Sequence, residues 1–178
     1  IELAQRVAEA LGDSAIALEL DVTDEQSWNL AIGACEQAFG SVSVLVNNAG
    51  LAEGAAIDDT TLESYRRVTE VNQTGVFLGM KSVIPAMKRV GHGSIINMSS
   101  LAGVRATGSL TAYNGAKAAV THMTKSVAMH CATNRYGIRC NSIHPGVIHT
   151  PILDKVLAQV PNPDEVYASW VATHPVGR

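Results

Sequence analysis

The chain has 178 residues, of which 47% are hydrophobic and 16% charged, the composition of a globular domain large enough to bury its own core. Its formal net charge is -3, from 13 basic and 16 acidic side chains, and no basic run occurs, so neither nucleic acid nor a membrane surface is an expected partner. Aromatic residues make up only 4%, too few for the stacking platforms that bind single-stranded nucleic acid. No apolar stretch approaches the ~18 residues of a membrane span.

The cysteines and histidines give no sign of a disulfide framework or of a metal site. Cys35, Cys131 and Cys140 are odd in number and scattered, with no C-x-x-C pair, which is typical of reduced thiols in a cytoplasmic protein. The six histidines show no pair at ligand spacing. We therefore predict no bound metal.

Taken in chain order, the elements alternate between helical and strand patterns. Helical periods cover residues 2–11, 25–39, 62–89 and 112–133. Short apolar runs predict buried strands at 15–20, 42–46, 94–98 and 138–143. Pro85 lies near the end of the third helix and predicts a kink or break there. After Gly146 the chain is rich in loop residues and closes with a weakly helical segment.

This alternation predicts an α/β fold, a Rossmann-like doubly wound parallel sheet with helices on both faces. We expect residues 1–178 to form a single domain, since no linker divides the chain. In such sheets ligands bind beyond the carboxyl ends of the strands. Polar or glycine-containing clusters follow the predicted strands at Asp21, Asn47, Ser99-Ser100 and His144-Pro145-Gly146, so these are candidate site residues.

Tyr113 and Lys117 stand four residues apart, on one face of the predicted helix, and Ser100 precedes Tyr113 by thirteen residues. Tyr-x-x-x-Lys alone is common on helix surfaces. An ammonium about 4 Å from the phenol contributes about 4 kcal/mol at an effective dielectric constant of about 20. At about 1.4 kcal/mol per pKa unit, Lys117 is expected to lower the pKa of Tyr113 by about two or three units, enough to make a general base.

Together these residues resemble the short-chain dehydrogenase/reductase family. Six segments match it in order and spacing: Leu20-Asp21-Val22, Asn47-Asn48-Ala49-Gly50, Val71-Asn72-Gln73-Thr74-Gly75, Ile95 to Ser100, Tyr113-x-x-x-Lys117 and Arg139 to Gly146. The stretch from Ile143 to Pro151 looks most like bacterial hydroxysteroid and cyclic-alcohol dehydrogenases. The resemblance implies an NAD(P)-dependent enzyme that interconverts a secondary alcohol and a ketone.

The resemblance also implies catalytic roles. Tyr113 would be the acid/base, and Lys117 would lower its pKa and hydrogen-bond the nicotinamide ribose. Ser100 would hold the substrate oxygen; Ser99 is the rival, and the spacing to Tyr113 favours Ser100. Asn72 would position a water that joins Lys117 to solvent.

Cofactor contacts follow from the same resemblance. Asp21 would accept a hydrogen bond from the adenine amino group, with the Val22 backbone beside it. Asn47, Ala49 and Gly50 would pass close to the adenosine ribose. Around the nicotinamide the implied residues are Tyr113, Lys117, Pro145, Gly146, Ile148 and Thr150. NAD is slightly favoured over NADP, although the residue that would read the ribose 2′ position is not assigned.

The chain also departs from the family pattern. Gln73 replaces an apolar residue, and Asn114-Gly115 replaces the commoner Ser-Ala between Tyr113 and Lys117, with Gly115 costing the helix about 1 kcal/mol relative to Ala. No G-x-G-x-x-G phosphate loop occurs in the sequence. We expect the domain to lack its first βαβ unit and its C-terminal strand, and so to be incomplete at both ends.

Three functional hypotheses stay open. The first is the dehydrogenase, acting on a small hydrophobic alcohol or ketone, because the substrate-loop region, 151–178, carries Ile152, Leu153, Val156 and Leu157. The second is a catalytically silent binding or assembly module of the same fold, because the phosphate loop is missing. The third is a related chemistry such as epimerisation or dehydration. A homodimer or homotetramer is implied by the resemblance.

Overall fold

The computed structural model describes residues 1–158 and 160–175 of the chain, without the side chains of Ile152 and Lys155. The predicted substrate-loop region, 151–178, therefore lies partly outside the described residues, at 159 and 176–178. The helices are α1 (Glu2–Leu11), α2 (Glu25–Phe39), α3 (Leu62–Thr69), α4 (Gly75–Val90), α5 (Thr111–Thr133), α6 (Pro151–Leu157) and α7 (Pro163–Ala172). Short helical turns lie at Gly12–Ser14, Glu70–Thr74 and Leu101–Gly103, and the strands are β1 (Val44–Asn47), β2 (Gly93–Met98) and β3 (Ile138–Ile143).

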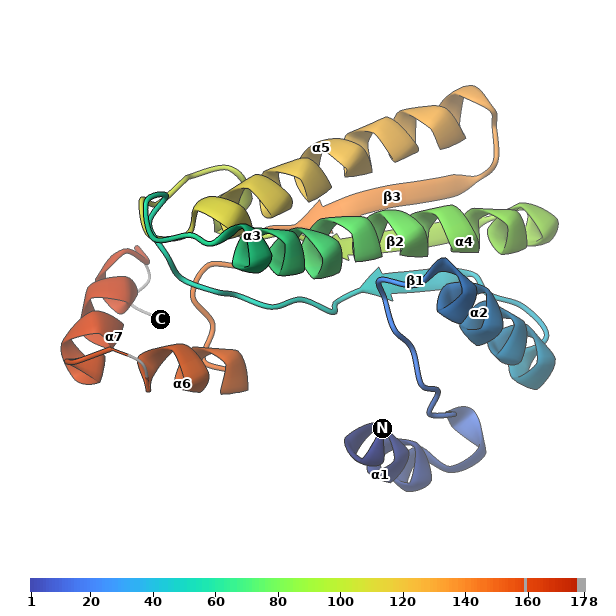
Figure 1. The fold of residues 1–178 in the computed structure, drawn as a ribbon. Coiled ribbons are helices and arrows are strands. Elements are labelled where there is room, and N and C mark those ends of the chain that lie inside the picture. Colours follow the sequence, from blue (N-terminus) through green and yellow to red (C-terminus); the bar gives the residue numbers. More distant parts are fainter. Residues whose placement is uncertain (159, 176–178) are drawn as a thin grey trace.

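The three strands form one parallel sheet in the order β1-β2-β3. Asn47 pairs with Asn97 across the first ladder, and Met98 with Ile143 across the second, so the carboxyl ends of all three strands meet at one edge. Helices connect the successive strands (Figure 1). The prediction of an α/β fold with a Rossmann-like parallel sheet is confirmed.

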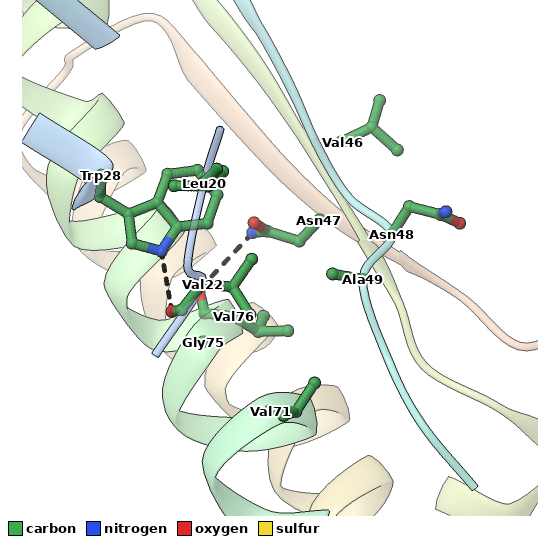
Figure 2. Close-up of a pocket in the computed structure, with 10 residues that line it drawn as sticks. All are labelled: Leu20, Val22, Trp28, Val46, Asn47, Asn48, Ala49, Val71, Gly75 and Val76. Atoms are coloured by element: carbon green, nitrogen blue, oxygen red, sulfur yellow. Dashed lines mark hydrogen bonds between the residues drawn. The ribbon is translucent and has the colours of Figure 1, made fainter. Parts of the chain in front are cut away.

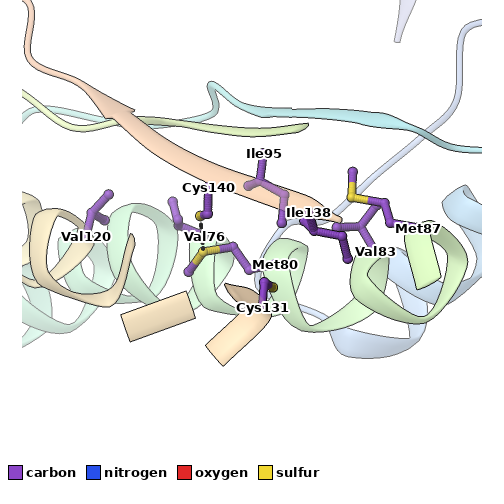
Figure 3. Close-up of a cluster of buried hydrophobic side chains, with 9 residues drawn as sticks. All are labelled: Val76, Met80, Val83, Met87, Ile95, Val120, Cys131, Ile138 and Cys140. Atoms are coloured by element: carbon purple, nitrogen blue, oxygen red, sulfur yellow. Dashed lines mark hydrogen bonds between the residues drawn. The ribbon is translucent and has the colours of Figure 1, made fainter. Parts of the chain in front are cut away.

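The core lies between this sheet and the helices α4 and α5 (Figure 3). Helix α4 contributes methionines and valines at helical spacing, and β2 and β3 contribute side chains from alternate positions, as each element's period requires. The buried cluster consists of Val76, Met80, Val83, Met87, Ile95, Val120, Cys131, Ile138 and Cys140. Helix α2 packs against α4 at the side of this layer. Through Val120 and Cys131 the core holds the middle and the last part of α5 against the sheet.

The opposite face of the sheet is open in the described residues. Val44 and Val46 of β1 point to this face, and their side chains are 58% and 51% exposed. Helix α1 has no buried residue and has apolar side chains along one side. A doubly wound sheet has a layer of helices on each face. The described residues form such a layer on only one face.

Helix ends follow the local signals in the sequence. Asp24 caps α2, because its carboxylate accepts hydrogen bonds from the amides of Gln26 and Ser27. Gly40 ends the same helix with a φ of 80°, a conformation that side chains with a Cβ rarely adopt. The predicted helix over 112–133 is confirmed as α5. In the part of the chain that the structure describes, no helix has both the length and the apolar character needed to cross a membrane.

Two sequence predictions about elements are wrong. Residues 15–20 are extended but form no strand, because within the described residues β1 hydrogen-bonds only to β2 and offers this segment no ladder. The segment 62–89 is not one regular helix: α3 and α4 are joined by a π-helical turn at Glu70–Thr74. A sequence period does not distinguish a π turn from an α turn, since it adds a single residue.

The predicted break at Pro85 is also absent, since α4 continues to Val90. Pro85 lies on the exposed side of the helix, so its ring faces solvent and water can satisfy the carbonyl that loses its amide partner. The proline therefore costs one hydrogen bond without ending the helix.

Candidate active site

Tyr113 and Lys117 lie in the first two turns of α5, where the helix begins beside the end of β2. As their spacing predicts, they share one face: the Lys117 ammonium is 5.5 Å from the centre of the Tyr113 ring. The Tyr113 ring packs with Val68, Ala112 and Ala116 in a small apolar cluster. The aromatic ring thus covers the lysine on one side.

Lys117 is only 4% exposed, and its ammonium donates a hydrogen bond of 2.8 Å to the carbonyl oxygen of Met98 at the end of β2. Burial lowers the pKa of Lys117 from 10.5 to about 8, because the charged form loses its water. A buried amine that titrates near neutral pH is typical of a functional site.

The expected lowering of the Tyr113 pKa is wrong for this structure. Burial raises the pKa of Tyr113 above its ordinary value of 10, and a hydrogen bond with the Ser100 side chain only partly opposes this effect. The physical reason is geometric: the Lys117 ammonium lies over the face of the ring and bonds to Met98, so it is not beside the phenol oxygen.

The two serines after β2 have different surroundings. Ser99 is 4% exposed, and its hydroxyl lies 2.9 Å from the Lys117 carbonyl oxygen and 2.8 Å from the Thr121 hydroxyl, both in α5. The Ser100 oxygen accepts a hydrogen bond from the amide of Ala102, which leaves its proton available for another oxygen. Ser99 is therefore committed to holding α5, whereas Ser100 faces Tyr113.

Asn72 lies in the π-helical turn and is fully buried. Its side chain makes hydrogen bonds to both backbone groups of Leu51 (3.3 Å from the amide, 2.8 Å to the carbonyl) and one to the Val68 carbonyl (3.0 Å). A Cβ atom on Gly50 would lie 2.8 Å from the Asn72 side-chain oxygen and 3.5 Å from the Lys117 nitrogen. Asn72 therefore fixes the turn after β1 directly beside Lys117.

A small hollow of about 110 Å³ opens at the carboxyl end of β1 (Figure 2). Its lining is mainly apolar and comes from the segment before α2, the end of β1 and the π turn: Leu20, Val22, Trp28, Val46, Asn47, Asn48, Ala49, Val71, Gly75 and Val76. The indole nitrogen of Trp28 donates to the Val22 carbonyl at 3.0 Å and holds this wall in place. Gly75 keeps the floor open, since a Cβ there would lie 3.0 Å from Val22.

Asp21 lies next to this hollow, exposed, and one of its carboxylate oxygens accepts hydrogen bonds from the amide and hydroxyl of Thr23. These bonds lower the pKa of Asp21, so the group stays ionised. An apolar hollow with a carboxylate at its edge suits a flat, amino-bearing aromatic base. The residues present thus fit the adenosine part of a dinucleotide.

Asn47, expected near the adenosine ribose, lies at the end of β1 and lines the hollow. It is 5% exposed and points toward the core, where its amide donates to the Asn97 side-chain oxygen at 2.8 Å. Asn97 is fully buried and donates in turn to Thr124 of α5 at 2.9 Å. The role of Asn97 was missed, although an Asn inside an apolar strand was a visible signal. The pair joins two strand ends to α5.

Pro145, Gly146, Ile148 and Thr150, the residues expected around the nicotinamide, lie on the loop between β3 and α6. The Pro145 carbonyl accepts from the Leu101 amide at 2.9 Å, so this loop adjoins the segment that follows Ser100. Ile148 is 59% exposed, and Thr150 is exposed at the start of α6. No group of three or more His, Cys, Asp and Glu side chains gathers at a metal-binding distance within the residues described.

Fold and site thus define a parallel α/β protein with a Ser-Tyr-Lys-Asn constellation at the carboxyl edge of its sheet. A family model described as Enoyl-(Acyl carrier protein) reductase, of the short-chain dehydrogenase/reductase type, matches residues 2–178. The chain belongs to the short-chain dehydrogenase/reductase family.

Curated relatives give the same family. The chain is 44% identical over 155 residues to a 3-alpha-(or 20-beta)-hydroxysteroid dehydrogenase of Mycobacterium bovis, with 87% of this chain and 59% of the relative covered. It is 45% identical over 152 residues to a trans-4-hydroxycyclohexanecarboxylate dehydrogenase of Sinomonas cyclohexanicum, with 84% of this chain and 58% of the relative covered. It is 41% identical over 156 residues to an NADP-dependent (R)-specific alcohol dehydrogenase of Lentilactobacillus kefiri, with 86% of this chain and 62% of the relative covered.

The chain therefore spans about three fifths of the length of these relatives. The predicted resemblance to hydroxysteroid and cyclic-alcohol dehydrogenases is confirmed by these matches.

Proposed function

We propose that the protein is an NAD(P)-dependent oxidoreductase that interconverts a secondary alcohol and a ketone, with Tyr113 as the acid/base. One observation carries the proposal: Ser100, Tyr113 and a buried Lys117 meet where β2 ends and α5 begins. The names of the relatives support it, since those reported above are all dehydrogenases.

A nicotinamide, when bound, supplies or accepts the hydride, and the chain handles the proton. The Tyr113 phenol donates a proton to the ketone oxygen in reduction and takes it back in oxidation. Because burial raises its pKa, the phenol is protonated at neutral pH and is ready to donate. The Ser100 oxygen accepts from the Ala102 amide, and its hydroxyl proton, which faces Tyr113 here, would turn to hold the substrate oxygen.

Lys117 and Asn72 support this proton transfer. When protonated, the Lys117 ammonium would hydrogen-bond the ribose of a bound nicotinamide. Its pKa of about 8 lets it take up and release a proton in the working pH range. Asn72, beside Gly50 and close to Lys117, positions the water through which that proton reaches solvent.

The cofactor contacts divide between the two ends of the site. For the adenosine half we propose the residues around the hollow: Asp21, Val22, Asn47, Ala49 and Gly50. For the nicotinamide half we propose Tyr113, Lys117, Pro145, Gly146, Ile148 and Thr150. NAD stays slightly favoured over NADP from the hydroxysteroid-like pattern, although one relative is NADP-dependent by name.

The substrate and the assembly complete the proposal. The relatives are named for steroid and cyclohexane substrates, which supports a small hydrophobic alcohol or ketone bound beside the region 151–178. All three cysteines are free thiols, which is typical of a cytoplasmic protein. A homodimer or homotetramer is the proposed assembly.

The test is Tyr113→Phe, which removes only the phenol oxygen. We expect turnover of cyclic secondary alcohols and their ketones to be lost, with the dissociation constants of NADH and NADPH changed less than about threefold. Tyr136→Phe is the matched control, because Tyr136 lies beyond the far end of α5, against Lys88, and should leave turnover unchanged. Turnover by the Tyr113→Phe variant comparable with that of the parent protein would refute the mechanism.

The same titrations separate the alternative functions. A catalytically silent module would bind neither NADH nor NADPH, or would bind one without turnover of any alcohol or ketone. Epimerisation or dehydration would depend on Tyr113 as well, but mass spectrometry of the products would show no net change in oxidation state.

A further inference from the structure

The loop that follows β3 is held from two sides, and the first is the segment after β2. His144 lies 3.1 Å from the Ser100 carbonyl oxygen through Nδ1 and 2.9 Å from the Ser142 hydroxyl through Nε2. The next residue accepts a hydrogen bond from the Leu101 amide through its carbonyl oxygen. This side of the loop is therefore tied to the residues around Ser100.

The second attachment comes from His174, which follows α7. Its Nε2 atom lies 3.2 Å from the amide nitrogen of Val147, and its Nδ1 atom lies 2.9 Å from the Trp170 carbonyl oxygen. A carbonyl oxygen only accepts, so Nδ1 carries the proton and Nε2 accepts from Val147. Gly146 is in tight contact with the ring, since a Cβ at that position would overlap Nε2.

We propose that His174, in its neutral form, is a positioning residue that docks α6 and α7 onto the loop of Gly146 and Val147, and so sets the nicotinamide and substrate contacts of that loop. This inference rests on the proposed function for its catalytic consequence. Figure 1 shows α6 and α7 together at the end of the molecule where α5 begins, and the loop that carries Gly146 and Val147 joins them to β3. An imidazole protonated on both nitrogens has no acceptor left, and the bond from Val147 would be lost.

The neighbouring titratable groups take no part in the hydrogen bond between His174 and Val147. Those on the packed segments that the structure describes are His144, His149, Asp154, Asp164, Glu165 and Tyr167. His149 contacts Asp154 at 3.6 Å and the edge of the Tyr167 ring, and Glu165 accepts from Asn162. Within the described residues, the hydrogen-bond partners of His174 are uncharged groups of Val147, Trp170 and Thr173.

His144 provides an internal contrast. Its Nε2 atom faces a hydroxyl, which can either donate or accept, so a doubly protonated ring keeps both contacts by rotation of the Ser142 proton. His174 faces a backbone amide, which can only donate. The attachment to α7 therefore needs a ring nitrogen that accepts, whereas the attachment to Ser100 does not.

The test compares His174→Gln with His174→Phe in the intact protein. Gln presents an oxygen near the position of Nε2 and should keep the bond, whereas Phe fills the space without an acceptor. With His174→Phe we expect the Michaelis constants for cofactor and substrate to rise roughly fivefold to tenfold, the value of one hydrogen bond, with kcat changed by less than about threefold. With His174→Gln both Michaelis constants should stay at the values of the parent protein. His122→Phe, at an exposed position on α5, is the control and should have no effect.

A second readout does not depend on turnover. Amide hydrogen exchange at Val147, measured by NMR, should show protection in the parent and in His174→Gln that is lost in His174→Phe. No protection in the parent, or equal behaviour of the Gln and Phe variants, would overturn the proposal. If the protein shows no turnover but the Val147 protection follows this pattern, the docking by His174 is upheld and the proposed function is refuted.

Discussion

Replacing Lys117 with Met removes a buried ammonium and keeps an unbranched side chain of similar length. In the folded protein the pKa of Lys117 is about 8, against 10.5 for the ordinary side chain, because burial disfavours the charged form. Below pH 8 the protein therefore carries a charge that would be more stable in water. We predict that folding stability rises with pH in the parent protein and that Lys117→Met lacks this rise.

The sign and the size follow from proton linkage. Between about pH 8 and 10.5 the unfolded chain still holds the Lys117 proton that the folded protein has released, so a higher pH favours the folded state. The pKa values differ by about 2.5, which at about 1.4 kcal/mol per pKa unit corresponds to roughly 3 kcal/mol. About 2.5 kcal/mol of this rise falls between pH 7 and pH 10.

Urea unfolding of both proteins, followed by circular dichroism from pH 7 to pH 10, measures the effect. The useful quantity is the difference between the two free energies of unfolding at each pH. Burial raises the pKa of Cys140 to about 11, which makes stability fall above about pH 9, but this contribution is common to both proteins and cancels. A stability difference that stays constant over the whole range would refute the lowered pKa, whatever its absolute size.

Two glycine substitutions give further predictions. Gly50→Ala should destabilise the fold by about 1–3 kcal/mol, because its Cβ would lie 2.8 Å from the side-chain oxygen of the fully buried Asn72. Urea unfolding measures this loss of stability, and an unchanged midpoint would contradict the predicted crowding. Gly115→Ala, in contrast, should stabilise by up to about 1 kcal/mol, since the position is exposed within α5 and its Cβ would meet nothing within 4 Å; a lower thermal midpoint would show that the glycine is needed for another reason.

Much of the site was predictable because its residues obey local rules. The i, i+4 spacing alone places Tyr113 and Lys117 on one helix face, and the end of a buried parallel strand places Ser100 at the sheet edge. The choice between Ser99 and Ser100 rested on spacing. The structure gives it a physical reason, since the Ser99 hydroxyl is engaged with the backbone of α5.

What could not be predicted depends on neighbours distant in sequence. Residues 15–20 have a strand composition, but a strand also needs a pairing partner, which composition does not reveal. The pKa of Tyr113 depends on where the Lys117 ammonium points, and that is decided by the Met98 carbonyl at the end of another element. The contact between His174 and Val147 spans 27 residues and leaves no periodic signal.

The hydrogen bond between Asn47 and Asn97 has a consequence for how the sheet assembles. The strands β1 and β2 are short and rich in valine and isoleucine, so sliding one past the other by two residues would still present apolar side chains to α4. Such a slip would break the bond between the Asn47 amide and the Asn97 side-chain oxygen in a mainly apolar interior, at about 1–3 kcal/mol for each group left unsatisfied, whereas the bond from Asn97 to Thr124 would remain. The Asn47–Asn97 pair thus specifies the register of β1 and β2, because it destabilises shifted pairings that hydrophobic packing alone would allow.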